Sequence, residues 1–451
     1  MRIAIVGAGI IGVTTAYELG ADGHEVTVFE RSGSVAAEGS FANAGVLAPG
    51  YVAPWAAPGM PRKLLTQLLG RHAAARLGGR PDAATLAWLW RWWRACGARS
   101  HGPNRARMQR LAAYSLERLR GLRQQLQLDY ERGQGYLVLL RGERELALAQ
   151  PGLTLLQELG VTHRLLDADE CRAAEPGLSA ETPLRAGIHL AQDEVGNCRQ
   201  FAHLLRLEAQ RLGVRFRFHT TVRRIEPGSP PSLLHEYTPP EESTAAAIAL
   251  SARADFASSE GPATVPQALE PQLERFDAIV VCAAMGSAAL LRPLGLKLPL
   301  APVWGYSITA PLRRLEAHPD LGPRAALMDE RYKVAISRIG QRVRVAGSAE
   351  LGGRPEVYNE AAIATLHKVL HDWFPGAAHS AQAQRWKGAR PMLPDGPPVL
   401  GSSGLAGIWL NLGHGGSGWA LSCGSARVLA DQLAGRQAGV DTEGLDLARL
   451  R

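Results

Sequence analysis

The first thirty residues alternate between apolar runs and a glycine-rich break. Residues 2–6 are an apolar run of strand length, and residues 13–19 have a pattern that can open a helix. A second run, rich in β-branched residues, ends at Glu30. Strand and helix therefore alternate from the start of the chain, which predicts a parallel sheet in an α/β fold.

Further along, the pattern changes from alternating elements to mostly strands. Helical spacing is found in residues 105–128, 153–159, 198–212 and 361–373. Strand patterns are found in residues 136–140, 214–218, 220–225, 276–283, 302–310, 331–337 and 342–348. Because the last three strand patterns follow one another without a helix, we expect a second, mixed and largely antiparallel domain there.

Residues 83–96 predict an aromatic helix. At about 100° per residue, one face carries Leu86, Leu89, Trp90 and Trp93, flanked by Trp88, Trp92 and Cys96. The remaining arc carries Arg91 and Arg94. So wide an apolar arc either packs inside the second domain, which we favour, or lies against a membrane surface with its arginines at the headgroups.

Residues 226–275 differ sharply in composition from the rest of the chain. They contain eight prolines and six serines, and eight acidic residues stand against two basic ones. Such a segment cannot bury enough apolar surface to offset its ordering entropy. We therefore expect a low-complexity acidic insertion at a hairpin rather than a domain.

Length and composition limit the classes of protein. A chain of 451 residues with 46% apolar residues typically forms two domains with buried cores. The net charge is +8, but no basic cluster interleaved with aromatic residues indicates a nucleic-acid partner. No apolar stretch reaches the about 18 residues that a membrane span requires.

The cysteines and the N-terminus bear on the compartment. Cysteines stand alone, without CxxC spacing, at Cys96, Cys171, Cys198, Cys282 and Cys423. This scatter argues against a disulfide framework and a thiolate metal site, so we expect no metal. A glycine motif begins too near the first residue for an export signal to precede it, which predicts a cytoplasmic protein. The aromatic helix leaves a peripheral contact with the inner membrane open.

Three glycines after the first predicted strand indicate a dinucleotide site. The spacing GxGxxG is formed by Gly7, Gly9 and Gly12. Gly7 allows a tight turn, Gly9 lets backbone N–H groups approach a pyrophosphate, and Gly12 lets the helix touch the strand. With Ile10 and Ile11, they place a helix N-terminus against the phosphates.

Two further positions complete the nucleotide half of this site. The carboxylate of Glu30 would accept hydrogen bonds from a ribose hydroxyl and repel a 2′-phosphate, which favours FAD or NAD over NADP. We count the adjacent Arg31 among the cofactor contacts. Val222 lies in the predicted strand at 220–225, which is typical of the strand that completes an adenine pocket in proteins with two dinucleotide folds.

Small residues form two more candidate contacts with a cofactor. A loop whose hydroxyl, amide and backbone suit such contacts, or which is an ordinary loop, contains Ser40, Asn43, Ala44 and Gly45. Near the C-terminus, a strand at 408–412 and a helix from about Trp419 enclose Gly413, Gly415, Gly416 and Gly418. A second helix N-terminus suits the negative charge at N1 and the C2 oxygen of a reduced isoalloxazine ring, which favours FAD over NAD.

Five stretches of the chain combine into a more specific pattern. They are GAGIIG with Glu30, SFANAG at 40–45, RYKVA at 331–335, RPM at 390–392 with PDG at 394–396, and GHG at 413–415 with Gly418 and Trp419. These stretches resemble the FAD-dependent D-amino acid dehydrogenases, within the wider D-amino acid oxidase and glycine oxidase family of flavoproteins. The similarity covers nearly the whole chain apart from residues 226–275.

The resemblance implies noncovalent FAD in a Rossmann-like domain that is split in sequence. We expect the FAD-binding domain at 1–48, 150–225, 276–300 and 390–451, and the substrate domain at 49–149 and 301–389. The implied reaction is oxidative deamination of a D-amino acid to a 2-oxo acid and ammonium, with the electrons passed to a quinone or another carrier. Alternatives are a related flavoenzyme that takes secondary amines such as D-hydroxyproline, D-proline or sarcosine or uses oxygen directly, an NAD-binding oxidoreductase, and a noncatalytic FAD-bound subunit.

By the same resemblance, three side chains form the catalytic site. Arg390 would grip both oxygens of the substrate carboxylate in a planar fork, or form a structural salt bridge. Tyr332 would add a hydroxyl donor to that carboxylate, or is a half-buried strand residue. His414 would contact substrate or the electron path, or is a hydrogen-bonded turn residue. Gly415 stands near where glycine oxidases have an arginine, so a glycine substrate is less expected, and Cys423 is expected to be a small buried residue.

Overall fold

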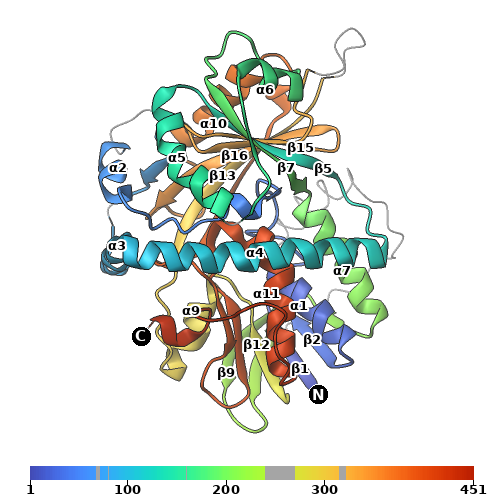
Figure 1. Cartoon of the computed structure of the whole chain (residues 1–451). Coiled ribbons are helices and arrows are strands. Elements are labelled where there is room, and N and C mark those ends of the chain that lie inside the picture. Colours follow the sequence, from blue (N-terminus) through green and yellow to red (C-terminus); the bar gives the residue numbers. More distant parts are fainter. Residues whose placement is uncertain (68–71, 80, 159, 239–269, 314–320, 451) are drawn as a thin grey trace.

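The computed structural model describes residues 1–67, 72–79, 81–158, 160–238, 270–313 and 321–450. Figure 1 shows two halves, one above the other, with both termini in the lower half. The lower half holds a mostly parallel sheet and the upper half a larger, mostly antiparallel sheet. The α/β fold with a second, mixed domain is therefore confirmed.

The lower half is built on a six-stranded sheet. Its strands, in spatial order, are β18 (Val399–Ser402), β19 (Ile408–Leu412), β12 (Ala278–Val281), β1 (Arg2–Val6), β2 (Glu25–Phe29) and β8 (Arg215–Arg217). All neighbours are parallel except β18 and β19. The apolar residues of one sheet face pack against α1 (Ile10–Ala21), α7 (Cys198–Arg211) and α11 (Gly418–Leu433).

A small antiparallel sheet covers the other face of the six-stranded sheet. It consists of β9 (Thr220–Glu226), β10 (Ser232–Tyr237) and β11 (Gln272–Arg275), and α9 (Gly286–Leu291) packs beside it. The strands β10 and β11 lie inside the segment 226–275, so the ends of that segment are structured and form the expected hairpin. Residues 239–269, which make up most of the expected low-complexity insertion, lie outside the described residues.

The upper half is built on a ten-stranded sheet. Its main path is β17 (Gln384–Met392), β13 (Ala301–Pro311), β16 (Arg342–Leu351), β15 (Val334–Ile339), β14 (Ala326–Asp329), β5 (Arg132–Leu140), β7 (Ala186–Gly196) and β3 (Val46–Leu47). The two other strands are β4 (Ala75–Leu77) beside β16 and β6 (Arg164–Leu166) beside β7. Helix α10 (Glu360–Trp373) packs on the face that points away from the lower half, with α6 (Ala168–Ala174) nearby.

Helix α4 (Ala98–Leu126) runs across the front of the molecule between the two halves (Figure 1). Its Arg118 donates to Glu18 of α1 at 2.7 Å. Two and five residues further along, Arg120 and Arg123 both bind Glu194 of β7, at 2.7 and 2.6 Å. Helix α4 therefore fixes the parallel half to the antiparallel half with buried carboxylates on each side.

The structure differs from the expected domain limits at two places. Segment 150–225 was expected in the FAD-binding domain, but it contains β7, which pairs along β5 in the ten-stranded sheet. Segment 49–149 was expected in the substrate domain, but it contains α4, which packs closely on α11 where Gly424 lies against Ser115. Both differences arise from tertiary pairing, which local sequence patterns do not encode.

The aromatic helix α3 (Ala83–Ala95) is present, but its buried face is not the expected one. Trp88, Trp92 and Cys96 are buried against Trp55. Most of the expected core face is exposed instead, with 54% for Leu86, 60% for Trp90 and 52% for Trp93, and only Leu89 of that face packs, half-buried, on the same cluster as Trp88. Within the described part of the chain, no helix combines the length and apolar character needed to span a membrane.

Candidate active site

The N-terminal glycines form a cradle at the start of α1. Gly7 has φ +101°, and a Cβ at Gly12 would lie 1.9 Å from the carbonyl oxygen of Gly7. A Cβ at Gly9 would lie 3.7 Å from Ser40 Oγ, which itself accepts the Ile10 N–H at 3.1 Å. No side chain caps α1, and its first turn carries no acidic residue. This turn therefore has the close backbone approach and the positive helix end that a pyrophosphate requires.

Glu30 stands at the end of β2, beside this cradle. Its carboxylate accepts the N–H groups of Ala8 at 2.6 Å and Ser32 at 2.8 Å. Burial raises the pKa of Glu30, while the two backbone hydrogen bonds oppose that rise. The neighbouring Arg31 is exposed and makes a bidentate pair with Glu38, with both hydrogen bonds at 2.7 Å. Glu30 thus fits the nucleotide site, whereas Arg31 is committed to a surface ion pair.

Val222 lies in β9 and packs, half-buried, on the apolar cluster between the six-stranded sheet and the small antiparallel sheet. This cluster includes Val6 and Phe29, which directly precede the glycine turn and Glu30. Strand β9 begins beside the predicted nucleotide contacts, because the Thr220 N–H donates to the Glu30 carbonyl oxygen at 2.8 Å, and Val222 lies two residues further along this strand.

The loop at 40–45 connects the cradle with the ten-stranded sheet. Within the loop, Asn43 Oδ1 accepts the Gly45 N–H at 3.0 Å. The carbonyl oxygens of Ala42, Asn43 and Ala44 accept hydrogen bonds from the sheet, at 2.8, 3.2 and 2.7 Å, from Ser307, Arg344 and Ser337. The loop is therefore fixed between the two halves of the molecule.

Arg344 was not among the predicted residues. It is buried, and its Nε also donates to Thr309 Oγ1 at 3.0 Å. Burial lowers the pKa of Arg344 to about 10. In the sequence, an arginine that alternates with apolar residues along a strand is expected on the solvent-exposed face. Only the folded sheet shows that Arg344 is buried and holds the loop at 40–45.

The C-terminal glycine loop lies beside the N-terminal cradle because α1 and α11 pack together. Thr15 Oγ1 accepts from Asn411 Nδ2 at 3.0 Å, and Thr14 Oγ1 donates to the Ser422 carbonyl oxygen at 3.3 Å. The loop itself requires glycine, with φ +79° at Gly413 and +56° at Gly415.

The same loop leads directly to the predicted clamp. A Cβ at Gly415 would lie 2.5 Å from Met392 Sδ, and one at Gly416 would lie 3.3 Å from Arg390 Cδ. Helix α11 begins at Gly418 without a side-chain cap and without an acidic residue in its first turn. The predicted convergence of two glycine turns and two helix N-termini is therefore present.

His414 is buried behind this loop. Its Nε2 lies 3.1 Å from Ser425 Oγ, and Ser425 donates its single hydroxyl hydrogen to the Ser422 carbonyl oxygen at 3.1 Å. Nε2 of His414 is therefore the donor, which leaves Nδ1 as an acceptor. Burial lowers the pKa of His414 to about 3, so the ring is neutral at physiological pH. The structure thus presents a neutral residue that holds the loop on α11.

Arg390, on β17, extends along the sheet face that points toward the loop at 40–45. Its Nη1 donates to the Ser348 carbonyl oxygen at 2.7 Å. Its guanidinium lies against Gly305, where a Cβ would come within 2.4 Å of Nη2. No carboxylate pairs with Arg390 among the residues that the structure describes. Burial lowers its pKa to about 10, which leaves it charged at neutral pH.

Tyr332 lies in the turn between β14 and β15. Its ring is 5.0 Å from the Arg141 guanidinium and 5.3 Å from Lys368 Nζ, and it packs on the cluster under α10. No described contact joins it to Arg390. Its predicted hydrogen bond to a substrate carboxylate therefore stays a prediction.

A polar cluster next to Tyr332 was missed in the sequence. Tyr51 Oη donates to Glu330 Oε2 at 2.7 Å, and Lys333 donates to Glu330 and, at 3.1 Å, to Tyr51. Lys333 has φ +52° and precedes Val334, which pairs with Gly347, the neighbour of Ser348. The cluster therefore lies just before the start of β15, one strand away from Ser348, which accepts a hydrogen bond from Arg390. The sequence pattern predicted a strand from residue 331, whereas the structure has a turn there and begins β15 at Val334, so the pattern did not show which of these side chains face the site.

The remaining predictions concern cysteine and metals. Cys423 is buried in α11, and burial raises the pKa of its thiol to about 12, as expected for a packing residue. Within the described residues, no group of three or more histidine, cysteine or acidic side chains is placed to hold a metal ion.

Comparisons with known proteins agree with this geometry. The family model described as "FAD dependent oxidoreductase" matches residues 2–432. The chain is 41% identical over 451 residues to a D-amino acid dehydrogenase of Cereibacter sphaeroides, covering 100% of this chain and 95% of that protein. A D-amino acid dehydrogenase of Bradyrhizobium diazoefficiens is 39% identical over 451 residues, with 100% and 99% covered.

Solved structures show the same fold. Glycine oxidase from Geobacillus kaustophilus superimposes with a TM-score of 0.71 at 18% identity, covering 99% of both chains. L-proline dehydrogenase from P. horikoshii gives 0.68 at 14% identity, covering 100% of this chain and 97% of that one. The chain belongs to the DAO family of FAD-dependent oxidoreductases. The glycine cradle, Glu30 and the uncapped start of α11 fit the FAD that this family uses.

Proposed function

We propose that this chain oxidises D-amino acids to 2-oxo acids and ammonium. The observation that carries the proposal is Arg390, a half-buried guanidinium beside the C-terminal glycine loop with no carboxylate partner among the described residues. A charged fork of this kind, fixed on one side by Ser348, binds a carboxylate in two parallel hydrogen bonds. The named relatives of about 40% identity are D-amino acid dehydrogenases, which supports the substrate class.

In this proposal, noncovalent FAD supplies the hydride acceptor when it is bound. The FAD contacts are the two glycine turns, Glu30, Val222 and the loop at 40–45. Arg390 fixes the substrate carboxylate and so sets the position of Cα. The neutral His414 holds the glycine loop on α11, and the cluster of Tyr51, Glu330 and Lys333 supplies polar groups just before the start of β15.

Secondary amines are the second candidate substrate class. A neighbour in fold, L-proline dehydrogenase from P. horikoshii, is named for such a substrate. The clamp at Arg390 binds the carboxylate of either class equally well, since it does not contact the amine. The distinction therefore rests on experiment.

Anaerobic reduction of the bound flavin tests the proposal. The purified protein is expected to be yellow, and D-amino acids with a free amino group are expected to bleach its visible absorbance. The matched L-amino acids, D-proline and sarcosine serve as the comparison set, and ammonium and 2-oxo acid are measured as products. Bleaching by secondary amines alone, or by no amino acid, would overturn the assignment.

We also propose the destination of the electrons and the place of the protein. The electron acceptor is a quinone or another carrier, and the chain is cytoplasmic with a peripheral contact to the inner membrane through residues 83–96. The exposed aromatic face of α3 supports this contact. Turnover with a water-soluble quinone analogue, compared with oxygen as acceptor, tests the acceptor.

A further inference from the structure

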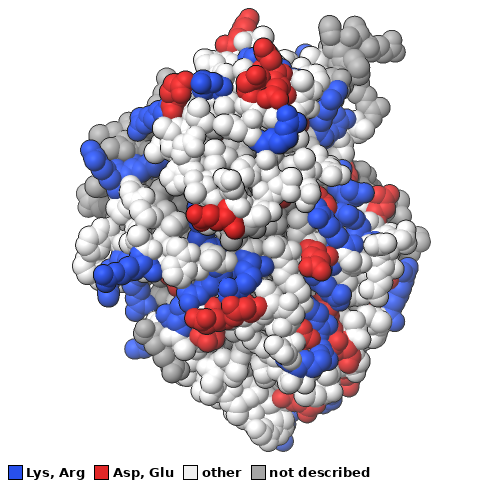
Figure 2. Space-filling model, in the orientation of Figure 1, with Lys and Arg blue, Asp and Glu red and all other residues white. Residues whose placement is uncertain are grey.

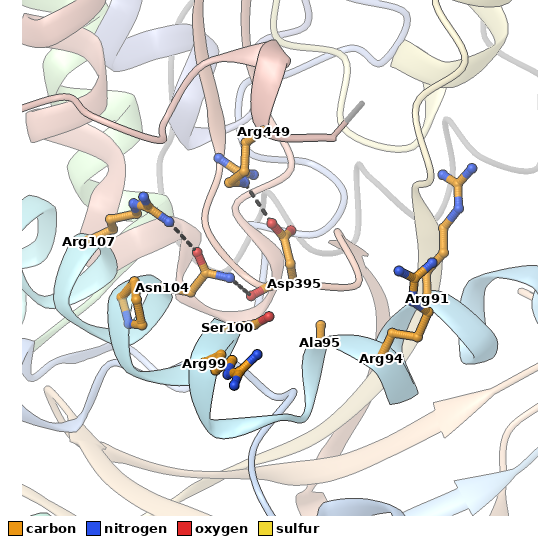
Figure 3. A pocket seen from close by; sticks show the side chains of 10 residues that line it. Arg91, Arg94, Ala95, Arg99, Ser100, Asn104, Arg107, Asp395 and Arg449 are labelled. Carbon is orange, nitrogen blue, oxygen red and sulfur yellow. Dashed lines mark hydrogen bonds and ion pairs between the residues drawn. The ribbon is translucent and has the colours of Figure 1, made fainter.

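A surface hollow of about 480 Å³ lies between α3, α4 and the C-terminal helix η5 (Leu447–Leu450), outside the candidate active site. Five arginines line it: Arg91, Arg94, Arg99, Arg107 and Arg449. In Figure 3 the arginines of α3 stand on one side of the hollow, and Arg107 and Arg449 on the other. Asp395 is the one carboxylate in the lining. So large an excess of positive charge in a hollow attracts anions.

Two of these arginines are already engaged by the protein. Arg449 Nε donates to Asp395 Oδ2 at 2.7 Å, and Arg107 Nη1 donates to Asn104 Oδ1 at 2.9 Å. The other three are exposed and have no carboxylate partner among the described residues: Arg91, Arg94 and Arg99. The hollow therefore combines a fixed wall with three guanidinium groups that remain available to a ligand.

Helix α3 places an aromatic face beside these arginines. Leu86, Trp90 and Trp93 fall within one narrow sector of the helix, opposite the buried Trp88 and Trp92. The exposed Trp90 and Trp93 rings pack on each other with centroids 5.0 Å apart. Arg91 and Arg94 follow on the next sector, and Figure 2 shows Lys and Arg side chains gathered around α3 and the N-terminal end of α4.

We propose that this arginine hollow binds the phosphate of an anionic phospholipid headgroup, while Leu86, Trp90 and Trp93 enter the boundary between headgroups and acyl chains. Guanidinium forks match phosphate oxygens, and tryptophan rings favour the headgroup level of a bilayer. The inference rests on the peripheral contact proposed above and is independent of the proposed reaction. To that contact it adds the kind of lipid, one with an anionic headgroup, and the residues that bind the headgroup.

A free phosphate uses only half of this surface. The hollow alone would suffice for a dissolved anion, whereas the paired, exposed tryptophans next to it are an apolar surface that water disfavours. An anionic lipid satisfies both parts, because its phosphate and its glycerol region lie at adjacent depths. The charge and the aromatic face are therefore explained by one ligand.

Co-sedimentation of the FAD-loaded protein with vesicles tests this inference. We expect binding to vesicles of equal parts phosphatidylcholine and phosphatidylglycerol at low ionic strength, and no binding to phosphatidylcholine alone. Each arginine near an anionic surface contributes roughly fivefold to partitioning, so Arg91→Gln with Arg94→Gln should weaken it about thirtyfold. Arg132→Gln with Arg275→Gln, two exposed arginines elsewhere, is the charge-matched control.

Three outcomes overturn the inference. The first is equal loss in the control pair, which shows a nonspecific charge effect. The second is vesicle binding that the Arg91→Gln, Arg94→Gln protein retains and the Trp90→Ala, Trp93→Ala protein loses. This result would keep the peripheral contact through the aromatic face but remove the arginine hollow as a headgroup site. The third is a protein that inorganic phosphate stabilises against thermal unfolding but that does not bind vesicles. This result would assign the hollow to a dissolved anion. All six substituted residues are exposed, and turnover with a soluble acceptor confirms that each variant is folded and tests the proposed reaction separately.

Discussion

The guanidinium of Arg390 lies directly against the backbone of Gly305, where a Cβ would come within 2.4 Å of Nη2 and 2.6 Å of Cζ. The two residues stand on neighbouring strands, since Val303 of β13 pairs with Arg390 of β17. The φ of Gly305 is not positive, so the close approach of the Arg390 guanidinium, and not the backbone conformation, favours glycine at this position.

Gly305→Ala is therefore expected to displace the Arg390 guanidinium without unfolding the sheet. We expect the KM for the preferred amino acid to rise about tenfold, or roughly 1.4 kcal/mol of lost binding, with the smaller effect on kcat. Steady-state kinetics with a saturating soluble acceptor measure both constants. Gly121→Ala in α4, where no heavy atom lies within 4 Å of the added Cβ, is the control and should leave KM unchanged. An unchanged KM in the Gly305→Ala protein contradicts this role.

Removing the clamp itself has a larger effect. Arg390→Leu is expected to lower kcat/KM at least tenfold, or about 1.4 kcal/mol, because a carboxylate then loses both hydrogen bonds and the opposing charge. Arg390→Lys keeps the charge but not the planar fork, so we expect an intermediate value. The flavin content of each variant shows whether the cofactor site is intact. A loss smaller than tenfold in Arg390→Leu would falsify the clamp assignment.

The cradle could be predicted from sequence because its requirements are local. Gly7, Gly9 and Gly12 follow one strand directly, and each spacing reports a backbone constraint that only glycine satisfies. The same holds for the strand β19 and the glycines after it, whose bounds the structure reproduces at 408–412. Short-range steric rules therefore fixed these elements before any packing was known.

The neighbours of the clamp could not be predicted, because they come together through sheet register. Gly305, Ser348 and Arg390 are far apart in the chain and meet only through the pairing of β13 with β16 and β17. Similarly, the periodicity of α3 gave a correct helix but a wrong core face. The burial of Trp88 and Trp92 is decided by Trp55, which lies outside that helix.

Gly12→Ala tests the cradle. Its Cβ would overlap the Gly7 carbonyl oxygen at 1.9 Å, so the turn must open and the backbone must leave the phosphates. We expect the Kd for FAD to rise more than about a hundredfold, in line with roughly 3 kcal/mol for a forced overlap. The ratio of flavin to protein absorbance after desalting measures this loss.

The control for that experiment is Gly102→Ala. This position lies in α4, and nothing lies within 4 Å of the added Cβ. It should keep its full flavin content. A Gly12→Ala protein that retains stoichiometric FAD would show that the turn is not the pyrophosphate site.

The buried His414 makes the stability of the protein depend on acid. Its pKa is lowered to about 3 by burial, whereas the unfolded chain has the ordinary value for histidine, about 6.5. The unfolded state therefore binds a proton that the folded state refuses, so the contribution of His414 is fully present above pH 6.5 and is lost as the pH falls from 6.5 toward 3.

Replacing His414 by glutamine should remove this dependence, because glutamine does not titrate and still offers a donor to Ser425. Between pH 7 and pH 5, the free energy of unfolding of the native chain should fall by about 2 kcal/mol more than that of His414→Gln. Urea unfolding at both pH values measures the difference. His379→Gln, at an exposed position, should behave like the native chain. Equal acid sensitivity in the His414→Gln protein would mean that the ring accepts a proton while folded, and that His414 is open to acid–base chemistry after all.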